Sequence, residues 1–299
     1  MNTIIQVIAG PTASGKSALA IQKARECNGV IICADALQVY DALPLLTAQP
    51  SAEDRQAAPH MLYGVISPLE ICSATRWATM AVDAIRQVLD NGQTPILVGG
   101  TGLYLRTLME GLSPVPDIAP DIRDMLNARQ RELGNPAFHE ALSKVDPVMA
   151  GRLHPNDTQR LIRAWEVLEA TGESLATWQE QEPVPRVPEW SYHLLILDPP
   201  RDVLYDRCNK RFLIMMEQGA LEETRSYDGQ IKAGAALSDG GATQALGFRP
   251  LRAYLNGEIS EETAIERAQT DTRQYAKRQV TWLKNQMKIG GRVLTLQRS

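Results

Sequence analysis

The sequence has few cysteines, and none of them is placed to bind zinc or to build a disulfide framework. Its 299 residues include four cysteines, which are widely spaced and form no C-x-x-C pair. These are Cys27, Cys33, Cys72 and Cys208. Because zinc sites and disulfide-rich folds show closely spaced cysteines, we expect reduced thiols and a cytoplasmic protein.

Long apolar runs and an excess of positive charge are also missing. No segment reaches the ~18 apolar residues that a membrane helix needs, so we expect no membrane span. The short apolar run at the N-terminus has no basic residue before it, unlike a secretory leader. The net charge is −4, which argues weakly against a general nucleic-acid binder. Residues 265–299 differ, because eight Lys or Arg stand against two acidic residues there, and such a local basic face can hold phosphates.

A glycine-rich motif near the N-terminus predicts a phosphate-binding loop. Residues 10–17 read G-x-x-x-x-G-K-S, between a predicted strand at 4–9 and a helix that starts near residue 18. This arrangement aims backbone N–H groups and the positive end of the helix at a phosphate. Lys16 adds a positive charge, and the Ser17 hydroxyl can bind Mg²⁺. The predicted phosphate-binding residues are Gly10, Pro11, Thr12, Ala13, Ser14, Gly15, Lys16 and Ser17.

A second buried strand is predicted at 30–34 and ends at Asp35. The crossover between the two strands is long enough to make them parallel, and ligands bind beyond the carboxyl ends of parallel strands. We therefore expect Asp35 beside the phosphate-binding loop, where it can act as a general base or bind Mg²⁺ through water. The alternative is an aspartate that only stabilises the turn after the strand.

A strand predicted at 95–98 is followed by three glycines around Thr101. Glycines there let the backbone approach a ligand closely, so Thr101 can hydrogen bond at a reacting centre, although a tight turn explains the pattern as well. A P-loop ATPase usually has a metal-binding Asp after such a strand, and this strand has none. The sequence also has no Asn-Lys-x-Asp pattern for guanine. We infer that the loop holds a phosphate that is not hydrolysed.

The remaining patterns predict an α/β fold, a P-loop NTPase-like parallel sheet flanked by helices. Further strands are expected at 61–66 and 192–197, and helices at 74–89, 201–218, 242–255 and 261–288. Arg207 and Arg211 lie one turn apart, which suits a diphosphate but is equally usual on a surface. Gln274, Arg278 and Trp282 share one helical stripe, which is more often a packed edge than a nucleic-acid contact.

Two proline-rich stretches, at 114–120 and 183–188, divide the chain. We expect a core domain of residues 1–114 and 189–299 and a helical insertion domain at 115–188. Helices are predicted within the insertion at 121–133, 138–143 and 158–171.

The insertion is not basic overall, so any grip on nucleic acid must come from placed residues. Arg160 and Arg163 are three residues apart and share one helix face, which could equally be a solvated surface. Asn156 or Asp157 can cap this helix. We expect His154 to be a turn residue rather than a catalyst.

Taken together, these stretches resemble the tRNA dimethylallyltransferases, which prenylate adenosine 37 of tRNA. The matching segments run in the family's order over nearly the whole chain. They lie at 10–17, 34–40, 59–60, 97–104, 110–113, 154–157, 159–163, 211–212, 245–248 and 273–283. The chain departs from the family pattern at Asp41, Ala42, Gln49, Phe248 and Pro250, which we expect to affect tRNA contacts more than the reaction.

The resemblance implies a reaction and a set of site residues. The reaction is transfer of a dimethylallyl group from dimethylallyl diphosphate to N6 of adenosine 37, in tRNAs that read codons beginning with U. Asp35 corresponds to the general base, Thr101 to a catalytic positioning residue, and Arg211 to a catalytic residue that binds the diphosphate. Mg²⁺ is the implied cofactor, with Ser17 as its ligand. Residues implied to contact the anticodon stem-loop of tRNA are Asp35, Ala36, Leu37, Gln38, Thr101, Arg123, Gln159, Arg160, Leu161, Ile162 and Arg163.

We expect this enzyme to be a monomer. Two other functions compete with this one. A small-molecule or nucleotide kinase would use the same loop with ATP, but the missing metal-binding Asp and the lack of an arginine-rich lid count against it. A non-catalytic RNA-binding module that depends on a nucleotide would leave Asp35 and Thr101 without a purpose. Label transfer from dimethylallyl diphosphate to tRNA would separate the three.

Overall fold

The chain forms two compact units. The computed structural model describes residues 3–287 and 293–298. One unit, here called the core unit, comprises Met1–Glu110 and Arg186–Ser299, and the other, the insertion, comprises Gly111–Pro185. The boundaries predicted at 114/115 and 188/189 lie three or four residues further along the chain than these.

A parallel sheet forms the centre of the core unit. Its described strands are β1 (Thr3–Ala9), β2 (Gly29–Cys33), β3 (His60–Met61), β4 (Thr94–Gly99), β5 (Trp190–Ile196) and β6 (Val293–Arg298). They are ordered β3-β2-β4-β1-β5-β6, and each neighbouring pair is parallel. The predicted α/β fold is confirmed, and the phosphate-binding loop follows a strand in the middle of the sheet, where such folds bind ligands.

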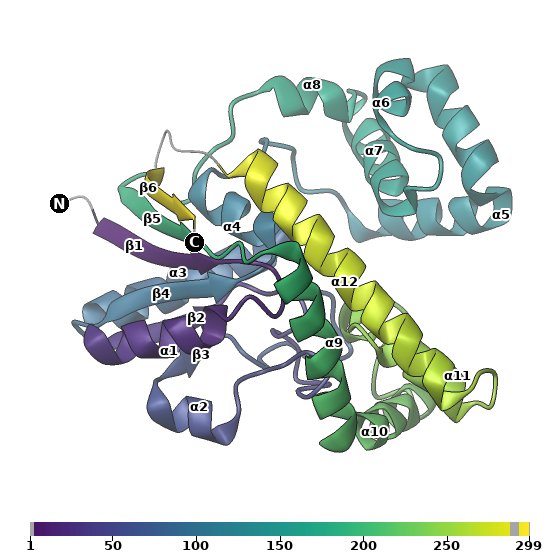
Figure 1. Ribbon diagram of the computed structural model, residues 1–299. Helices are drawn as coiled ribbons and strands as arrows, with labels where there is room; N and C mark the ends of the chain where they lie inside the picture. The colour runs from purple at the N-terminus through teal and green to yellow at the C-terminus, as the bar shows by residue number, and fades with distance from the viewer. Residues whose placement is uncertain (1–2, 288–292, 299) are drawn as a thin grey trace. The chain divides into compact units, whose positions relative to one another are not determined.

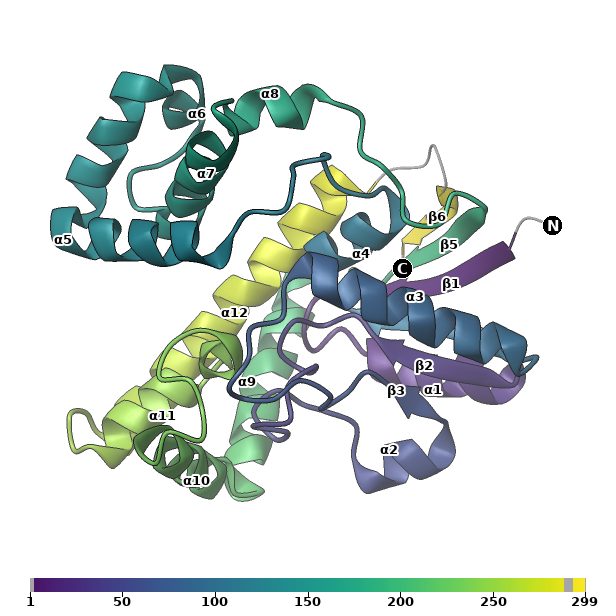
Figure 2. The ribbon, with the colours of Figure 1, turned by 180° about the vertical axis from the view of Figure 1, so that it is seen from behind.

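Helices cover both faces of the sheet, with α1 and α3 on opposite sides (Figures 1 and 2). The helices of the core unit are α1 (Lys16–Glu26), α2 (Ala52–Ala57), α3 (Ala74–Asp90), α4 (Gly102–Met109), α9 (Arg201–Glu217), α10 (Ala220–Lys232), α11 (Phe248–Leu255) and α12 (Glu261–Gln286), with a short 3-10 helix at Gly241–Gln244. Helix α3 buries one apolar side, which includes Trp77, and Trp77 donates a hydrogen bond to the Cys33 carbonyl at 2.8 Å. No helix in the described part of the chain is long and apolar enough to cross a bilayer.

Three predicted elements differ from the structure. The strand predicted at 61–66 is only His60–Met61, because Leu62 and Gly64 have left-handed φ of 64° and 66° and turn the chain away. The helix predicted at 242–255 is interrupted at Gly247, whose φ is 92°. The last helix ends at Gln286, and Lys288 and Arg292 of the basic C-terminal run lie outside the described residues.

The insertion is an all-helical unit with its own core. Its helices are α5 (Pro120–Val145), α6 (Pro147–Arg152), α7 (Thr158–Thr171) and α8 (Leu175–Glu180). Gly134, with φ of 71°, breaks α5 two residues before Pro136, which matches the two helices predicted there. Phe138 and Trp165 pack in the core with ring centroids 5.9 Å apart. Separate burial of this kind lets the segment fold around its own apolar residues.

Candidate active site

The glycine motif forms the predicted loop between β1 and α1. Gly15 stands at the start of α1 with φ of 95°, a conformation that favours glycine. At Gly10 a Cβ would lie 2.7 Å from the Ser14 hydroxyl and 3.0 Å from the Leu197 carbonyl oxygen, so only glycine fits there. The loop curls back on itself, since Lys16 Nζ donates to the Pro11 carbonyl at 3.3 Å.

Two arginines of α9 approach this loop. The Arg211 guanidinium donates to the Thr12 hydroxyl, and Arg207, one turn earlier on α9, approaches the Ser14 carbonyl at 3.5 Å. Desolvation lowers the pKa of Lys16 to about 8 although nearby Asp35 opposes it, and burial lowers the pKa of Arg211. Neither Lys16 nor Arg211 forms an ion pair with a carboxylate among the described residues. Desolvated cations without a paired carboxylate favour binding of an anion.

Asp35 lies beside the loop, as expected from the ends of parallel strands. Its Oδ1 accepts hydrogen bonds from Leu37 N at 3.0 Å and Gln38 N at 3.4 Å. The carboxylate also lines a cavity together with Lys16 and Arg211. Asp35 therefore stabilises its turn and faces the cavity at once, so it does more than hold the turn, and its role as a general base stays a prediction.

Thr101 connects the ends of two strands. Its Oγ1 accepts a hydrogen bond from Ala36 N at 2.9 Å, and it interacts with the hydroxyl of Tyr275 through a side-chain hydrogen bond. A Cβ at neighbouring Gly99 would lie 1.9 Å from the Ala34 carbonyl oxygen, so glycine is required for this approach. Thr101 thus holds the residue after Asp35 in place.

Two residues of α12 that the sequence did not single out complete the site. Gln279 Oε1 accepts from Thr12 N at 2.8 Å, and its Nε2 donates to the Gly100 carbonyl at 3.0 Å, so one buried amide joins the phosphate-binding loop to the turn before α4. Tyr275, one turn earlier, lines the cavity, and burial raises its pKa. A buried polar stripe with Thr272 on this helix is the signal that could have found them.

The cavity has a charged end and an apolar side. Thr12, Lys16, Ser17 and Arg211 supply the polar groups. The apolar lining is Leu37, Leu46, Ala48, Phe212, Met215 and Leu246. A ligand that joins a diphosphate to a short hydrocarbon chain matches both parts.

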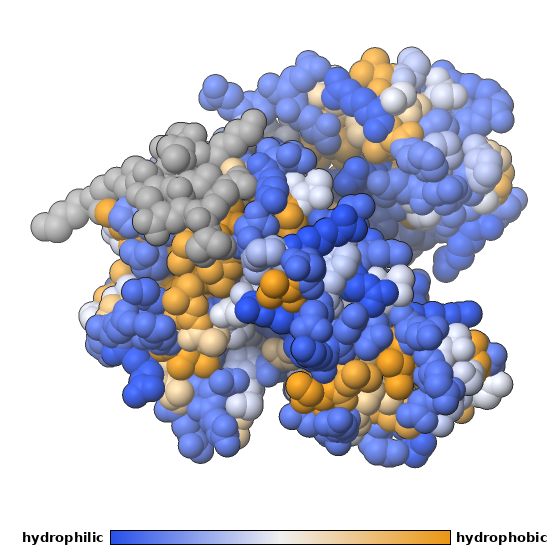
Figure 3. Space-filling model, in the orientation of Figure 1, coloured by the Kyte–Doolittle hydropathy of each residue, from blue (hydrophilic) through white to orange (hydrophobic). Residues whose placement is uncertain are grey.

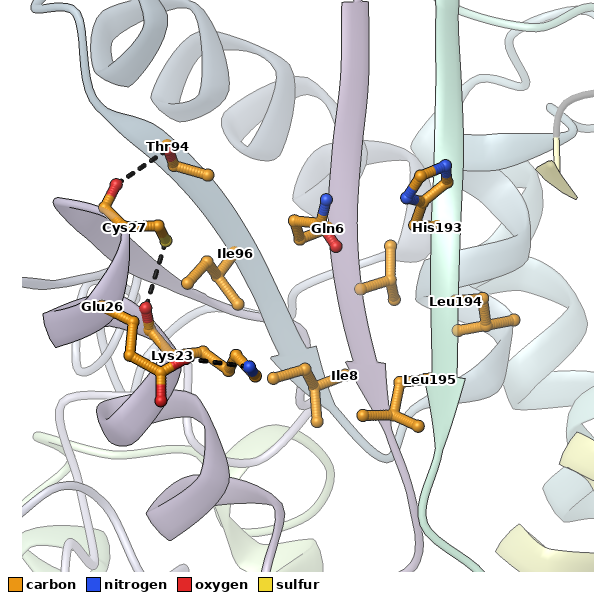
Figure 4. A pocket seen from close by; sticks show the side chains of 11 residues that line it. Gln6, Ile8, Lys23, Glu26, Cys27, Thr94, Ile96, His193, Leu194 and Leu195 are labelled. Atoms are coloured by element: carbon orange, nitrogen blue, oxygen red, sulfur yellow. Dashed lines mark hydrogen bonds and ion pairs between the residues drawn. The ribbon is translucent and has the colours of Figure 1, made fainter. Parts of the chain in front are cut away.

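A larger hollow of about 350 Å³ on the α1 face of the sheet has different chemistry (Figure 4). Its floor is built by side chains of β1, β4 and β5, including Ile8, Ile96 and Leu195. The one lysine that lines it, Lys23, is paired with Glu26 at 2.8 Å. With its cation neutralised in this way, the hollow is a poorer place for a phosphate than the cavity beside Lys16.

Gln274 and Arg278 of the predicted stripe of α12 are exposed, whereas Trp282 is partly buried. Hydrophilic side chains follow this helix in Figure 3. Gln274, Arg278 and Trp282 lie on one side of a shallow groove of about 480 Å³. The Trp282 ring packs on Gly102, where a Cβ would lie 2.0 Å from it. Trp282 is therefore a packed edge, as the commoner interpretation held, with cationic side chains beside it.

The arginines predicted to contact tRNA surround a buried carboxylate in the insertion. Glu166 is 3% exposed and meets Arg123 at 3.3 Å and Arg163 at 3.1 Å. Arg160 is exposed and pairs with Asp157 at 3.3 Å. Asp157 is the N-cap residue of α7 but makes no capping hydrogen bond through its side chain.

The other residues of the insertion that the sequence singled out are buried, exposed or part of a turn. Leu161 and Ile162, implied as tRNA contacts, are buried in the insertion core, so their side chains pack rather than meet solvent. Gln159 is exposed. His154 is the turn residue we expected, since its Nδ1 accepts from Asn156 N at 3.1 Å.

The chain is similar to known proteins over most of its length. A family model described as IPP transferase matches residues 38–286. The chain is 51% identical over 281 residues to a tRNA dimethylallyltransferase of Paramagnetospirillum magneticum, covering 94% of this chain and 88% of the relative. It is 46% identical to a second, from Rhodospirillum centenum, over 95% of this chain and 89% of the relative.

Solved structures are similar as well. The tRNA isopentenylpyrophosphate transferase of Bacillus halodurans has a TM-score of 0.67 and 31% identity, covering 100% of this chain and 90% of that one. A eukaryotic dimethylallyltransferase crystallised while acting on tRNA has a TM-score of 0.81 and 31% identity, covering 99% of this chain and 74% of that one. These matches do not favour the kinase alternative. The chain belongs to the IPP transferase family.

Proposed function

We propose that the protein transfers a dimethylallyl group from dimethylallyl diphosphate to N6 of adenosine 37 in tRNAs that read codons beginning with U. One observation carries the proposal: Asp35 lines the same cavity as Lys16, Ser17 and Arg211. A general base beside a diphosphate-binding loop suits displacement of a diphosphate by a nucleophile that must lose a proton. Relatives named tRNA dimethylallyltransferase support the transfer of a dimethylallyl group to tRNA.

The residues of the cavity divide the work of the reaction. Backbone N–H groups of the loop, Lys16 and Arg211 bind the diphosphate, while the apolar side receives the prenyl group. The N6 nitrogen attacks the first carbon of the prenyl group, the bond from that carbon to oxygen breaks, and pyrophosphate leaves with the electron pair. Asp35 accepts the N6 proton, and the cations stabilise the charge that develops on the leaving group. The target base has to leave its stack to reach the cavity.

We propose Mg²⁺ as the cofactor, with Ser17 as its protein ligand. The Ser17 hydroxyl is exposed and lines the cavity, and oxygen is the donor that Mg²⁺ prefers. Among the described residues, no group of three His, Cys, Asp or Glu side chains is placed to hold a metal by itself. The ion would therefore depend on diphosphate oxygens and water, as Mg²⁺ often does, and would neutralise the leaving group when bound.

We propose further that the insertion contacts the anticodon stem-loop, through Arg123, Gln159, Arg160 and Arg163, and that the protein acts as a monomer. Guanidinium groups bind phosphates through paired hydrogen bonds. The cysteines Cys27, Cys33, Cys72 and Cys208 are free thiols, which fits action in the reducing cytoplasm.

Radiolabelled dimethylallyl diphosphate with unmodified tRNA tests the reaction. We expect label on tRNA that carries adenosine 37 and none on the same tRNA with guanosine 37, because guanosine offers no N6 amine. Consumption of ATP without label transfer would favour the kinase instead. Label on both tRNAs would contradict the assignment of position 37.

A further inference from the structure

One wall of the donor cavity is built from a strained stretch of chain. Residues 43–48, here called the wall segment, supply Leu46, Thr47 and Ala48 to the cavity lining. Two of its residues have left-handed φ although neither is glycine, 50° at Leu43 and 55° at Ala48. Such conformations persist only where the surroundings hold them. The wall segment therefore needs partners elsewhere in the core unit.

Glu223 is the distant partner that holds the segment by its N–H groups. This residue stands in the first turn of α10, and its carboxylate accepts hydrogen bonds from Leu45 N at 2.7 Å and Leu46 N at 2.9 Å. Both carboxylate oxygens are used, one for each N–H group. Hydrogen bonds to a charged acceptor are stronger than neutral ones. Glu223 forms no ion pair with a cation among the described residues, so its negative charge acts on the two backbone N–H groups of the wall segment.

The same segment is held from the other side by a residue of the site itself. Gln38 Nε2 donates to the carbonyls of Thr47 at 2.8 Å and Ala48 at 2.7 Å. The backbone N–H of Gln38 in turn donates to Asp35. A continuous set of hydrogen bonds thus runs from Glu223 through the wall segment to Asp35.

The apolar side of the cavity depends on where this segment sits. A Cβ at Gly247 would lie 2.6 Å from the Phe212 ring and 3.2 Å from Leu46, so these two side chains are close neighbours. Glu223 fixes the backbone N–H group of Leu46 and that of the preceding residue, Leu45. A shift of the segment would therefore change the space beside Phe212.

We propose that Glu223 is a positioning residue that fixes the wall segment and thereby limits the size of the prenyl group the cavity accepts. The inference rests on the proposed prenyl transfer. Glu223 does not touch the donor; it acts through Leu45 and Leu46. Loss of its carboxylate leaves the left-handed residues of the segment less well held and the cavity wall free to move outward.

The matched pair Glu223→Gln and Glu222→Gln tests this role. Glu222 is the neighbouring residue on α10, but it is exposed and its ion pair among the described residues is with Arg225 at 2.8 Å. In Glu223→Gln we expect kcat/KM for dimethylallyl diphosphate to fall by about tenfold, as for the loss of one charge-assisted hydrogen bond. The KM for tRNA stays near that of the wild type. Glu222→Gln behaves like the wild type.

Donor size separates positioning from a general loss of folding. The ratio of kcat/KM for dimethylallyl diphosphate over geranyl diphosphate should fall in Glu223→Gln, because the longer donor gains from a wall that moves. Unfolding of part of the sample would lower both values in proportion. An unchanged ratio, or an equal effect of Glu222→Gln, overturns the proposal. Absence of label transfer in the wild type would instead count against the proposed function.

Hydrogen exchange provides a measurement that needs no activity. The Leu45 and Leu46 amides should exchange more slowly in the wild type than in Glu223→Gln, with no change in Glu222→Gln. Should Glu223→Gln fail to fold, Glu223→Asp keeps the charge on a shorter side chain and should show a smaller effect in the same direction. Equal protection of both amides in wild type and variants overturns the proposal.

Discussion

The cations of the two units differ in their surroundings. Lys16 and Arg211 of the core unit are desolvated and face a cavity. Arg123 and Arg163 of the insertion are 64% and 45% exposed, and both pair with the buried carboxylate of Glu166. The core cations have no carboxylate partner among the described residues, and the insertion cations have one. A desolvated cation interacts strongly with one small anion because water does not screen it. An exposed cation is screened by salt and suits many weak contacts with a polyanion.

With the proposed function, the difference fits a division of the two substrates between the two units. The core cations match the diphosphate of the donor, where binding must also stabilise charge during the reaction. The insertion cations match the phosphates of tRNA, where position matters more than strength for each contact. Substitution of a cation in one unit should therefore leave the binding of the other unit's substrate unchanged.

The largest effect is expected for Asp35→Asn. The amide cannot accept the N6 proton, so single-turnover kcat should fall by about 10²- to 10⁴-fold. Its oxygen can still accept from Leu37 N and Gln38 N, which keeps the turn. The Kd for tRNA, measured by fluorescence anisotropy, should stay within about twofold, since the insertion is untouched. Undiminished label transfer would remove Asp35 from the role of base.

Lys16→Gln should lower kcat/KM for the donor by about 10²-fold, the usual effect of removing one donor to a developing negative charge. The pH profile is the sharper test. The pKa of Lys16 is about 8 in the free protein, so its positive charge is present below pH 8 and lost above it. Donor affinity of the wild type should therefore fall above pH 8 by up to about tenfold per unit.

The Lys16→Gln variant is its own control for that profile. The ionisation of the donor is common to both proteins, so the difference between their pH profiles belongs to Lys16. Isothermal titration with dimethylallyl diphosphate at several pH values measures it. Parallel profiles in the two proteins would show that Lys16 does not titrate in this range.

Arg163→Ala should have a smaller effect, on tRNA alone. We expect a several-fold rise in the KM for tRNA and a salt dependence of log Kd that is shallower by about one unit of slope. The KM for the donor should not change. Lys144→Ala is the matched control, because Lys144 is an exposed cation of the insertion whose ion pair, in the described part of the chain, is with Glu140 at 3.0 Å. Equal effects of the two variants would mean that the cluster around Glu166 has no special role.

The motifs of the core site could be predicted because their chemistry is local. Gly10, Gly15, Lys16 and Asp35 lie next to strands that the apolar pattern predicts, and parallel strands bring their carboxyl ends together. The third strand failed as a prediction because Leu62 has a positive φ, which no periodicity reveals for a leucine.

Residues whose partners lie far away in the sequence could not be predicted as part of the site from the sequence. Gln279 reaches Thr12 over 267 positions and Glu223 reaches Leu45 over 178. Helical spacing shows that a polar side chain faces inward, but its partner depends on tertiary packing. The same limit applies to Leu161, where the motif suggested RNA and the helix face dictated burial.

The smallest expected effect concerns stability. Holding Lys16 charged in a desolvated site is unfavourable for the free protein, since its pKa is lowered from 10.5 to about 8. Lys16→Met should therefore raise Tm at pH 7 without ligand by about 2 to 4 °C, the shift for about 1 kcal/mol in a domain of this size. Arg163→Ala should give no such rise, because Arg163 is half exposed and paired with Glu166.

The sign of the pH dependence follows from proton binding. Between pH 8 and 10.5 the unfolded wild type keeps the Lys16 proton and the folded protein releases it, so wild-type stability gains with pH there. The advantage of Lys16→Met should then shrink across that range in differential scanning fluorimetry. Added pyrophosphate should reverse the order at pH 7, because it stabilises only a protein whose loop carries the charge. A variant less stable than the wild type at pH 7 without ligand would show that the bond from Lys16 to Pro11 outweighs the cost of desolvation.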